Sequence, residues 1–253
     1  MHTVHKIGGS VLKDPKQLQK IAASFENDNQ QHTIVVSALY GVTDMLSALC
    51  SDTDSAKWYI EHLLNKYFEW TYILLSGTHR IVANRAIVAN LYRLQEIAKE
   101  YAEKKNEHLK AFVISEGERL AAIVLHAFFT KQKSQIICTE LSGIKTTLNA
   151  FDAEYLIDEV ALRSACLDSG LLNIIPGFYG VASNGQVCCV GRGGTDYTAA
   201  EVATKLGANR LIFWKDSNGL QTADPRLVKQ AVNVEHVSLH TLDLMSYAGS
   251  EVL

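Results

Sequence analysis

Apolar and polar positions near the N-terminus follow two different periods. Residues 33–39 are a short apolar run of the kind that forms strands, and residues 3–7, with Val4 and Ile7, also read as a short strand. Residues 15–26 between them place apolar side chains at helical spacing, and Pro15 suits the first turn of such a helix. Another helix is expected from about Thr43, whose hydroxyl can cap it. This order of elements predicts a strand-helix-strand unit of a parallel sheet.

The longest helical pattern covers residues 57–131, which contain no proline. Apolar side chains recur there at intervals of three and four residues, as at Leu91, Leu94, Ile97, Ala98 and Tyr101. We therefore expect an all-helical insertion in the N-terminal lobe.

The remaining residues return to alternating strands and helices. The pattern predicts strands at 135–139, 171–175, 186–190 and 210–214, and helices at about 152–167 and 197–206. Asn184-Gly185 lies between two alternating runs and predicts a tight hairpin. The expected fold class is α/β, a three-layer αβα sandwich whose central sheet is largely parallel and covered by helices on both faces.

Composition fits a soluble enzyme made of one domain or of two closely joined lobes. The 253 residues are 47% hydrophobic, carry a net charge of -3 and include three prolines. No basic stripe indicates a nucleic-acid partner, no apolar run is long enough for a membrane span, and no signal peptide opens the chain. The expected location is the cytoplasm.

Cysteine and histidine spacing gives no sign of a protein metal site. The cysteines form no CxxC pair, and Cys188 and Cys189 should point to opposite faces of one strand. We expect buried free thiols rather than disulfides. The nine histidines include no HExxH motif, so no residue is assigned to a metal.

Two glycine turns carry the candidate chemistry. The segment 191–194, Gly-Arg-Gly-Gly, leads from a predicted strand into a helix start, where backbone N–H groups and Arg192 can hold an anion. Near the N-terminus Lys6 precedes the turn Gly8-Gly9-Ser10, which also follows a strand. In a parallel sheet both turns fall at the carboxyl ends of strands, where ligands gather. We expect one cleft between them.

Seven short segments resemble the aspartokinases within the amino-acid kinase family. They are KIGGS at 6–10, VVSALYGVTD at 35–44, SEGERL at 115–120, PGFYG at 176–180, GRGGTDYTAA at 191–200, WKDSNG at 214–219 and TADPR at 222–226. They are similar to that family's KFGGTS, VVSAxAGVTD, SxGERL, PGFxG, GRGGSDYTA, WTDVDG and TTDPR, and they occur in the same order. The resemblance implies the amino-acid kinase fold.

The resemblance also implies roles for individual residues. Lys6, Asp196 and Lys215 would be catalytic, and Ser37, Thr43, Glu118 and Arg192 would bind the acceptor. Nucleotide contacts would come from Lys6, Gly8, Gly9, Ser10, Gly193, Gly194, Lys215, Asp216, Gln221 and Arg226. The implied cofactors are ATP and Mg²⁺, with the metal held mainly by the nucleotide phosphates.

Several of these residues also allow a simpler structural interpretation. Ser115 and Glu118 have the spacing of a capping box at the start of a helix over 116–131. Asp196 could only complement a helix dipole, and Lys6 could be exposed and idle. The sequence leaves these alternatives open.

Three positions depart from the family pattern. Glu251 replaces a lysine on the nucleotide side, and Lys215, where threonine is usual, could replace that missing cation. Tyr40 replaces a small residue before Gly41 and could reshape the acceptor side.

The expected activity is that of an aspartate kinase, which converts L-aspartate and ATP to 4-phospho-L-aspartate on the way to lysine, threonine and methionine. The alternatives are a different small carboxylate acceptor or a degenerate, ligand-binding regulatory module. Residues 1–253 would form a single catalytic domain, incomplete at its C-terminus and without a regulatory ACT-type domain. An acceptor lobe would cover about 1–170 and a nucleotide lobe about 171–253, and a homodimer or further domains of a longer polypeptide remain open.

Overall fold

The structure is a computed structural model that describes residues 1–24, 30–129, 134–136, 144–167, 172–216, 219–223 and 227–247. It divides into two compact units, Met1–Trp214 and Lys215–Leu253. The second unit carries helix α8 (Leu239–Tyr247) and an isolated antiparallel bridge between Gln221 and Asn233. The division into an acceptor and a nucleotide lobe stays a prediction.

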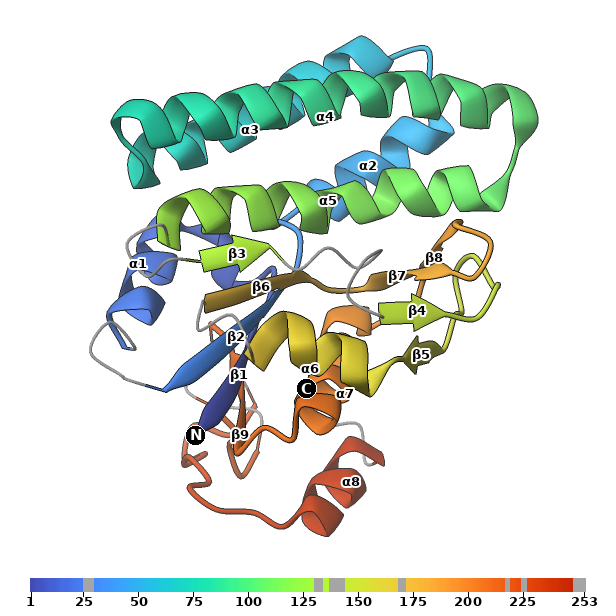
Figure 1. The fold of residues 1–253 in the computed structure, drawn as a ribbon. Coiled ribbons are helices and arrows are strands. Elements are labelled where there is room, and N and C mark those ends of the chain that lie inside the picture. Colours follow the sequence, from blue (N-terminus) through green and yellow to red (C-terminus); the bar gives the residue numbers. More distant parts are fainter. Residues whose placement is uncertain are drawn as a thin grey trace. The chain divides into compact units, whose positions relative to one another are not determined.

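A five-stranded parallel sheet forms the centre of the first unit (Figure 1). Its spatial order is β3 (Ser134–Ile136), β6 (Leu172–Pro176), β2 (Gln31–Val36), β1 (His2–Ile7) and β9 (Arg210–Trp214). Strand β1 lies between β2 and β9, so Lys6 is opposite Val35 on one side and Phe213 on the other. The strands predicted at 3–7, 171–175 and 210–214 are confirmed over their described residues, and that at 33–39 is confirmed up to Val36. Of the strand predicted at 135–139, residues 137–139 lie outside the described residues.

A four-stranded sheet continues this layer. Its order is β5 (Tyr155–Ile157), β4 (Ile144–Thr146), β7 (Tyr179–Ala182) and β8 (Val187–Cys189), with only the β4–β7 pair parallel. The predicted hairpin is confirmed, since Asn184-Gly185 joins β7 to β8 and Gly185 has φ +83°.

The helix predicted from about residue 152 is wrong in its first part. Residues Tyr155–Ile157 pair antiparallel with β4, and helix α6 runs only over Glu159–Leu167. The side chain of Asp158 accepts hydrogen bonds from the backbone N–H groups of Val160 and Ala161, at 3.0 and 3.1 Å. This acidic residue therefore caps the helix and sets its start.

The predicted helical insertion is confirmed as three long helices, α3 (Ala56–Leu74), α4 (Gly77–Lys104) and α5 (Glu107–Phe128). They follow the short turn η1 (Val11–Lys13) and helices α1 (Pro15–Ala23) and α2 (Val42–Ser51). The cap expected at Thr43 is wrong. Gly41 is the N-cap of α2, with φ +75°, and no side chain caps that helix.

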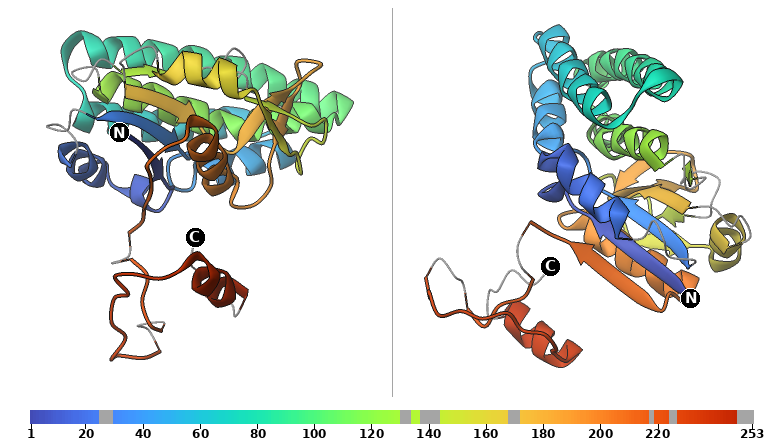
Figure 2. Two further views of the ribbon diagram at one scale, coloured as in Figure 1. Left: turned by 60° about the horizontal axis from the view of Figure 1, so that its bottom comes forward. Right: turned by 90° about the vertical axis from the view of Figure 1, so that its left-hand side faces the viewer.

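Two cores on opposite faces of the sheet make the fold three-layered. Ile7, Ile34 and Ile174 face the core formed with α1–α5. Val4 and Val35 face the core formed with α6 and with α7 (Gly194–Leu206). Figures 1 and 2 show the sheet between these helical layers. Apolar residues occur on both faces of these strands because both faces are buried.

The cysteines that the structure describes are free and buried, as predicted, whereas Cys138 lies outside the described residues. Cys188 and Cys189 pack into different cores, which confirms their opposite orientation. Among the helices in the described ranges, none is both long and apolar enough to cross a membrane.

Candidate active site

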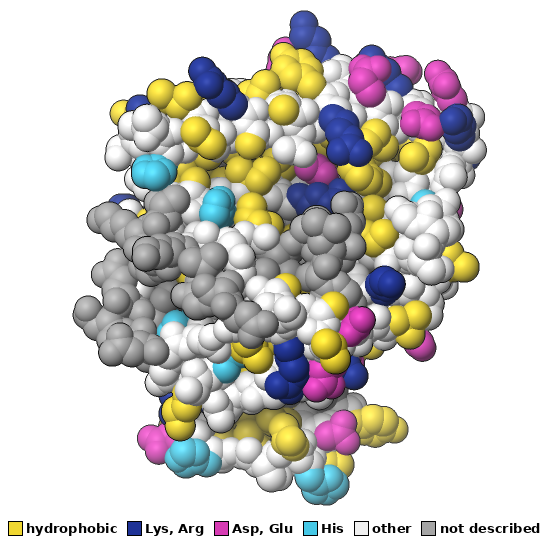
Figure 3. Space-filling model, viewed as in Figure 1, with side chains coloured by type: hydrophobic (Ala, Val, Ile, Leu, Met, Phe, Trp, Pro, Cys, Tyr) yellow, Lys and Arg dark blue, Asp and Glu magenta, His cyan; other side chains and the backbone are white. Residues whose placement is uncertain are grey.

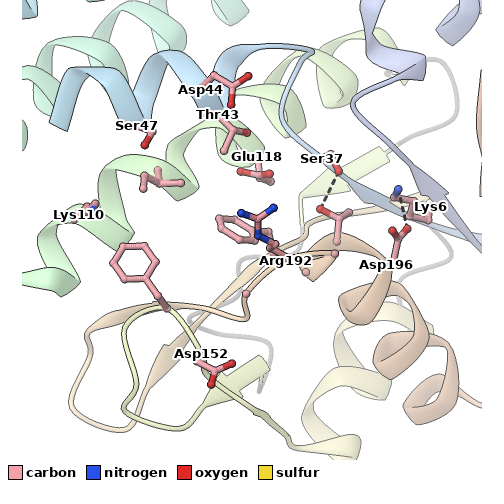
Figure 4. A pocket seen from close by; sticks show the side chains of 17 residues that line it. Lys6, Ser37, Thr43, Asp44, Ser47, Lys110, Glu118, Asp152, Arg192 and Asp196 are labelled. Atoms are coloured by element: carbon pink, nitrogen blue, oxygen red, sulfur yellow. Dashed lines mark hydrogen bonds and ion pairs between the residues drawn. The ribbon is translucent and has the colours of Figure 1, made fainter. Parts of the chain in front are cut away.

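A cavity of about 920 Å³ lies at the carboxyl ends of β1, β2 and β6 (Figure 4). Its walls come from the segments that follow these strands, from α2 and α5, and from the start of α7. The lining residues are Lys6, Ser37, Thr43, Asp44, Ser47, Lys110, Ile114, Glu118, Phe151, Asp152, Phe178, Gly191, Arg192, Gly193, Gly194, Thr195 and Asp196. All belong to the first unit. The two glycine-turn regions therefore share one cavity, as expected, through Lys6 and residues 191–194.

Lys6 is buried and paired at one end of this cavity. It is 8% exposed, and its Nζ lies 2.7 Å from Oδ1 of Asp196 in the first turn of α7. Within the described residues this oxygen has no hydrogen-bond partner, so the contact is an ion pair. A Cβ on Gly8 would lie 2.7 Å from the same Nζ, so any larger residue at this position would displace the Lys6 ammonium. This burial and pairing argue against an exposed, idle Lys6.

Glu118 lies in the middle of α5 and points into the cavity (Figure 4). Its Oε1 accepts a hydrogen bond of 3.1 Å from the backbone N–H of Ala38, while Oε2 has no hydrogen-bond partner in the described part of the chain. The side chain is 4% exposed, and this burial raises the pKa of Glu118 to about 8. The buried carboxyl is thus open to a cationic or hydrogen-donating ligand.

The capping-box interpretation of Ser115 and Glu118 is wrong. Helix α5 begins at Glu107, two turns before Ser115, and Asn106 caps it through its side chain. The Ser115 hydroxyl donates instead to the carbonyl of Phe112, at 3.0 Å. Neither residue therefore serves a helix terminus.

Arg192 faces Glu118 across the cavity (Figure 4). The flanking residues Gly191 and Gly193 have φ of +79° and +69°, a conformation that favours glycine, and they bend the chain over the start of α7. This helix begins at Gly194, three residues before its predicted start. Arg192 forms no ion pair within the described residues, so its guanidinium is available for a ligand.

Ser37 and Thr43 supply hydroxyl groups to the wall of the cavity. The Ser37 hydroxyl donates to Oγ1 of Thr195 at 2.8 Å and so links the end of β2 to α7. Thr43 stands in the first turn of α2 and lines the cavity.

Sequence reasoning missed five lining residues outside the motifs, Ser47, Lys110, Ile114, Phe151 and Asp152, and gave Asp44, Phe178 and Thr195 no role. A signal for some of them was present. Lys110, Ile114 and Glu118 follow one another at intervals of four on α5, and Thr43 and Ser47 do so on α2. Residues four apart share a helix face, so each known site residue could have identified its neighbours.

Other predicted site residues do not line the cavity. Gly8, Gly9 and Ser10 form the turn next to Lys6, where Gly8 O accepts from the N–H groups of Val11 and Leu12. Lys215, Asp216 and Gln221 belong to the second unit, and Arg226 and Glu251 lie outside the described residues. Their roles stay predictions.

Tyr40 is also absent from the residues that line the described cavity. Its side chain is 53% exposed, and Nζ of Lys13 lies 4.5 Å from the centre of its ring. The structure therefore gives no support to the expectation that Tyr40 reshapes the acceptor side.

Within the described ranges, no three or more histidine, cysteine, aspartate and glutamate side chains gather as a metal-binding group. Among the carboxylates of the cavity, that of Asp196 is paired with Lys6.

Aspartokinases are among the proteins that this chain resembles. Lysine-sensitive aspartokinase 3 of Escherichia coli (strain K12) is 27% identical over 99% of this chain and 57% of its own length. The aspartokinase of Geobacillus stearothermophilus is 28% identical over 77% of this chain and 47% of its own length. The chain thus spans about half the length of these curated relatives.

Solved structures agree with this result. The crystal structure of E. coli aspartokinase III in complex with lysine and aspartate matches 99% of this chain and 57% of its own, with a TM-score of 0.85 and 25% identity. A structure of isopentenyl phosphate kinase, at 14% identity and a TM-score of 0.53, shares the fold alone. The sequence profile described as the amino acid kinase family matches residues 1–253. The chain, with its three-layered fold and its cavity at the strand ends, therefore belongs to the amino acid kinase family.

Proposed function

We propose that the chain transfers the γ-phosphoryl group of ATP to the side-chain carboxylate of L-aspartate, giving 4-phospho-L-aspartate. The observation that carries this proposal is one cavity that holds the Arg192 guanidinium, unpaired within the described residues, together with a buried carboxyl group and a lysine-aspartate pair. The similarity of the chain to aspartokinases over almost the whole length of the chain supports L-aspartate as the acceptor.

The acceptor end of the cavity fits a small amino acid with two carboxylates. Arg192 can hold the α-carboxylate with two parallel hydrogen bonds, and Oε2 of Glu118 can accept from the α-ammonium. The hydroxyl of Thr43 adds a neutral partner. With both ends of the backbone held, the side-chain carboxylate would extend toward Lys6.

The other end supplies what phosphoryl transfer requires, which is alignment of two anions and compensation of their charge. The ammonium of Lys6 would lie against the transferring group, and Asp196 keeps that ammonium in place. Backbone N–H groups of the Gly8-Gly9-Ser10 turn and of Gly193 and Gly194 would hold the nucleotide phosphates.

Mg²⁺, when bound, supplies further positive charge on the phosphates. Oδ1 of Asp196 is engaged by Lys6, so we expect the ion to take its ligands mainly from the nucleotide. Asp216, Gln221 and Arg226 would contact ATP, and Lys215 would supply the cation that Glu251 lacks. If Lys215→Met leaves the turnover rate unchanged, this compensation by Lys215 is wrong.

The main alternative is another small acceptor, because the fold alone does not define the acceptor. Isopentenyl phosphate kinase shares this fold, and its name indicates that it phosphorylates a different acceptor. A coupled ADP-release assay over a panel of amino acids and small carboxylates separates the possibilities. We expect turnover with L-aspartate and its loss in Lys6→Met, with exposed Lys20→Met as the matched control. Turnover with another acceptor alone, or binding without turnover, would reject the aspartate kinase assignment.

A further inference from the structure

Phe178 has a backbone conformation that is strained for any residue other than glycine. Its φ is +72°, in the left-handed region. The residue lines the cavity and packs against the first residue of α7, since a Cβ on Gly194 would lie 2.7 Å from Cδ2 of Phe178. A strained residue persists only where its surroundings hold it, so the contacts of Phe178 identify what maintains this wall.

Hydrogen bonds hold the backbone of Phe178 on both sides. Its N–H donates to Oγ1 of Thr198 at 2.9 Å, and its carbonyl accepts from the N–H of Val190 at 2.9 Å. Val190 directly precedes the glycine-flanked loop that carries Arg192. The conformation of Phe178 and the start of this loop are therefore coupled.

The hydroxyl of Thr198 is the centre of this network. It donates to the carbonyl of Gly194 at 2.6 Å, accepts from Phe178, and lies 2.7 Å from the hydroxyl of Tyr155. A hydroxyl has one proton and two acceptor sites. If Thr198 donates to Gly194, the 2.7 Å contact takes its proton from Tyr155, whose other acceptor, the carbonyl of Tyr179, is farther away at 3.2 Å. Thr198 is fully buried and Tyr155 is 8% exposed, so water cannot readily replace either partner.

We propose that Thr198, oriented by Tyr155, is a positioning residue that holds Phe178 in its left-handed conformation and so keeps the Arg192 loop facing the acceptor. Neither Thr198 nor Tyr155 is among the residues that line the described cavity. Both act through Phe178 and Gly194, which line the cavity. The proposal deepens the acceptor site and rests on the proposed kinase function.

The test compares two substitutions that separate the hydroxyl from its shape. Thr198→Val keeps the branched side chain and removes the hydroxyl, and Thr198→Ser keeps the hydroxyl. We expect Thr198→Val to raise the KM for the acceptor about tenfold, with a smaller rise for ATP, because a buried hydrogen-bond centre is lost. Thr198→Ser should restore the wild-type KM. Thr204→Val is the control, since Thr204 donates to Ala200 O at 2.8 Å on the exposed side of α7.

Equal rises in both KM values, an unchanged acceptor KM, or no rescue by serine would overturn the proposal. If Thr198→Val does not fold, Tyr155→Phe replaces it, and an unchanged acceptor KM in that folded variant has the same meaning. A crystal structure of the full-length variant gives a readout that needs no activity. We expect the φ of Phe178 or the position of the 191–193 loop to change, and an unchanged site would overturn the positioning role even if the kinase assignment itself failed.

Discussion

Replacement of Glu118 by glutamine should stabilise the protein at alkaline pH while it weakens the acceptor site. Glutamine has the same shape, and its side-chain carbonyl can accept the hydrogen bond that Ala38 N–H now gives to the carboxyl. The change removes only the ability to ionise. Because burial raises the pKa of Glu118, this ability is unfavourable for the folded state.

The magnitude follows from the pKa of Glu118, which is about 8 in the folded protein against an ordinary value of 4.5. The folded state then binds its proton more tightly than the unfolded state, so raising the pH from 4.5 to 8 lowers the free energy of unfolding. The full effect is at most about 5 kcal/mol, and it is constant above pH 8. Glu118→Gln should avoid this loss, so its advantage over wild type should grow between pH 5 and pH 8.5.

In the wild-type protein, the affinity for the acceptor should rise with pH while the free energy of unfolding falls. At pH 7 only about one tenth of Glu118 is ionised, so the apparent affinity for an ammonium group should rise about tenfold from pH 6 to pH 7 and level off above pH 8. In Glu118→Gln we expect the affinity to be about 10-fold to 100-fold weaker and independent of pH.

Urea unfolding at pH 5, 7 and 8.5 measures the stability, and titration calorimetry with L-aspartate measures the affinity. Glu61→Gln, on the exposed side of α3, is the control for the loss of one carboxylate. If the stability difference between Glu118→Gln and wild type stays constant over this pH range, the argument that burial raises this pKa is refuted.

Three further substitutions test other parts of the site. Lys6→Met should lower kcat about 100-fold to 1000-fold in the ADP-release assay, and an equal loss in Lys20→Met would contradict a specific role. Arg192→Lys should raise the KM for the acceptor about tenfold with little change for ATP, because lysine cannot make the two parallel hydrogen bonds. Gly194→Ala should lower the unfolding free energy in urea by about 1–3 kcal/mol, since its Cβ would meet Phe178 at 2.7 Å, and unchanged stability would show that the wall can yield.

The sequence predicted those elements whose local pattern agrees with their burial. Strand β9 is mostly an apolar run, β1 has neighbours on both sides, and the insertion has long helical repeats without proline. The start of α6 was mispredicted because pairing of Tyr155–Ile157 with β4 overrides the local helical pattern. Such a pairing depends on a segment distant from the helix and is invisible in the pattern of one window.

The candidate site shows the same division. Lys6 and Arg192 were recognisable because glycine turns mark the strand ends, and the resemblance added Glu118. The contact between Lys110 and Phe151 was not recognisable from the sequence, because it joins an insertion helix to a loop of the second sheet. The Lys110 ammonium lies 5.4 Å from the centre of the Phe151 ring. Only the folded arrangement of these segments brings them together.

The location of β1 between β2 and β9 has a consequence for biosynthesis. The strand that carries Lys6 is made before the other strands of its sheet, and its partner β9 is made only after some two hundred further residues. Until then, one side of β1 exposes unpaired backbone groups to other nascent chains. Contacts so distant in sequence form slowly, so chaperones that shield this edge during translation should increase the yield of native protein.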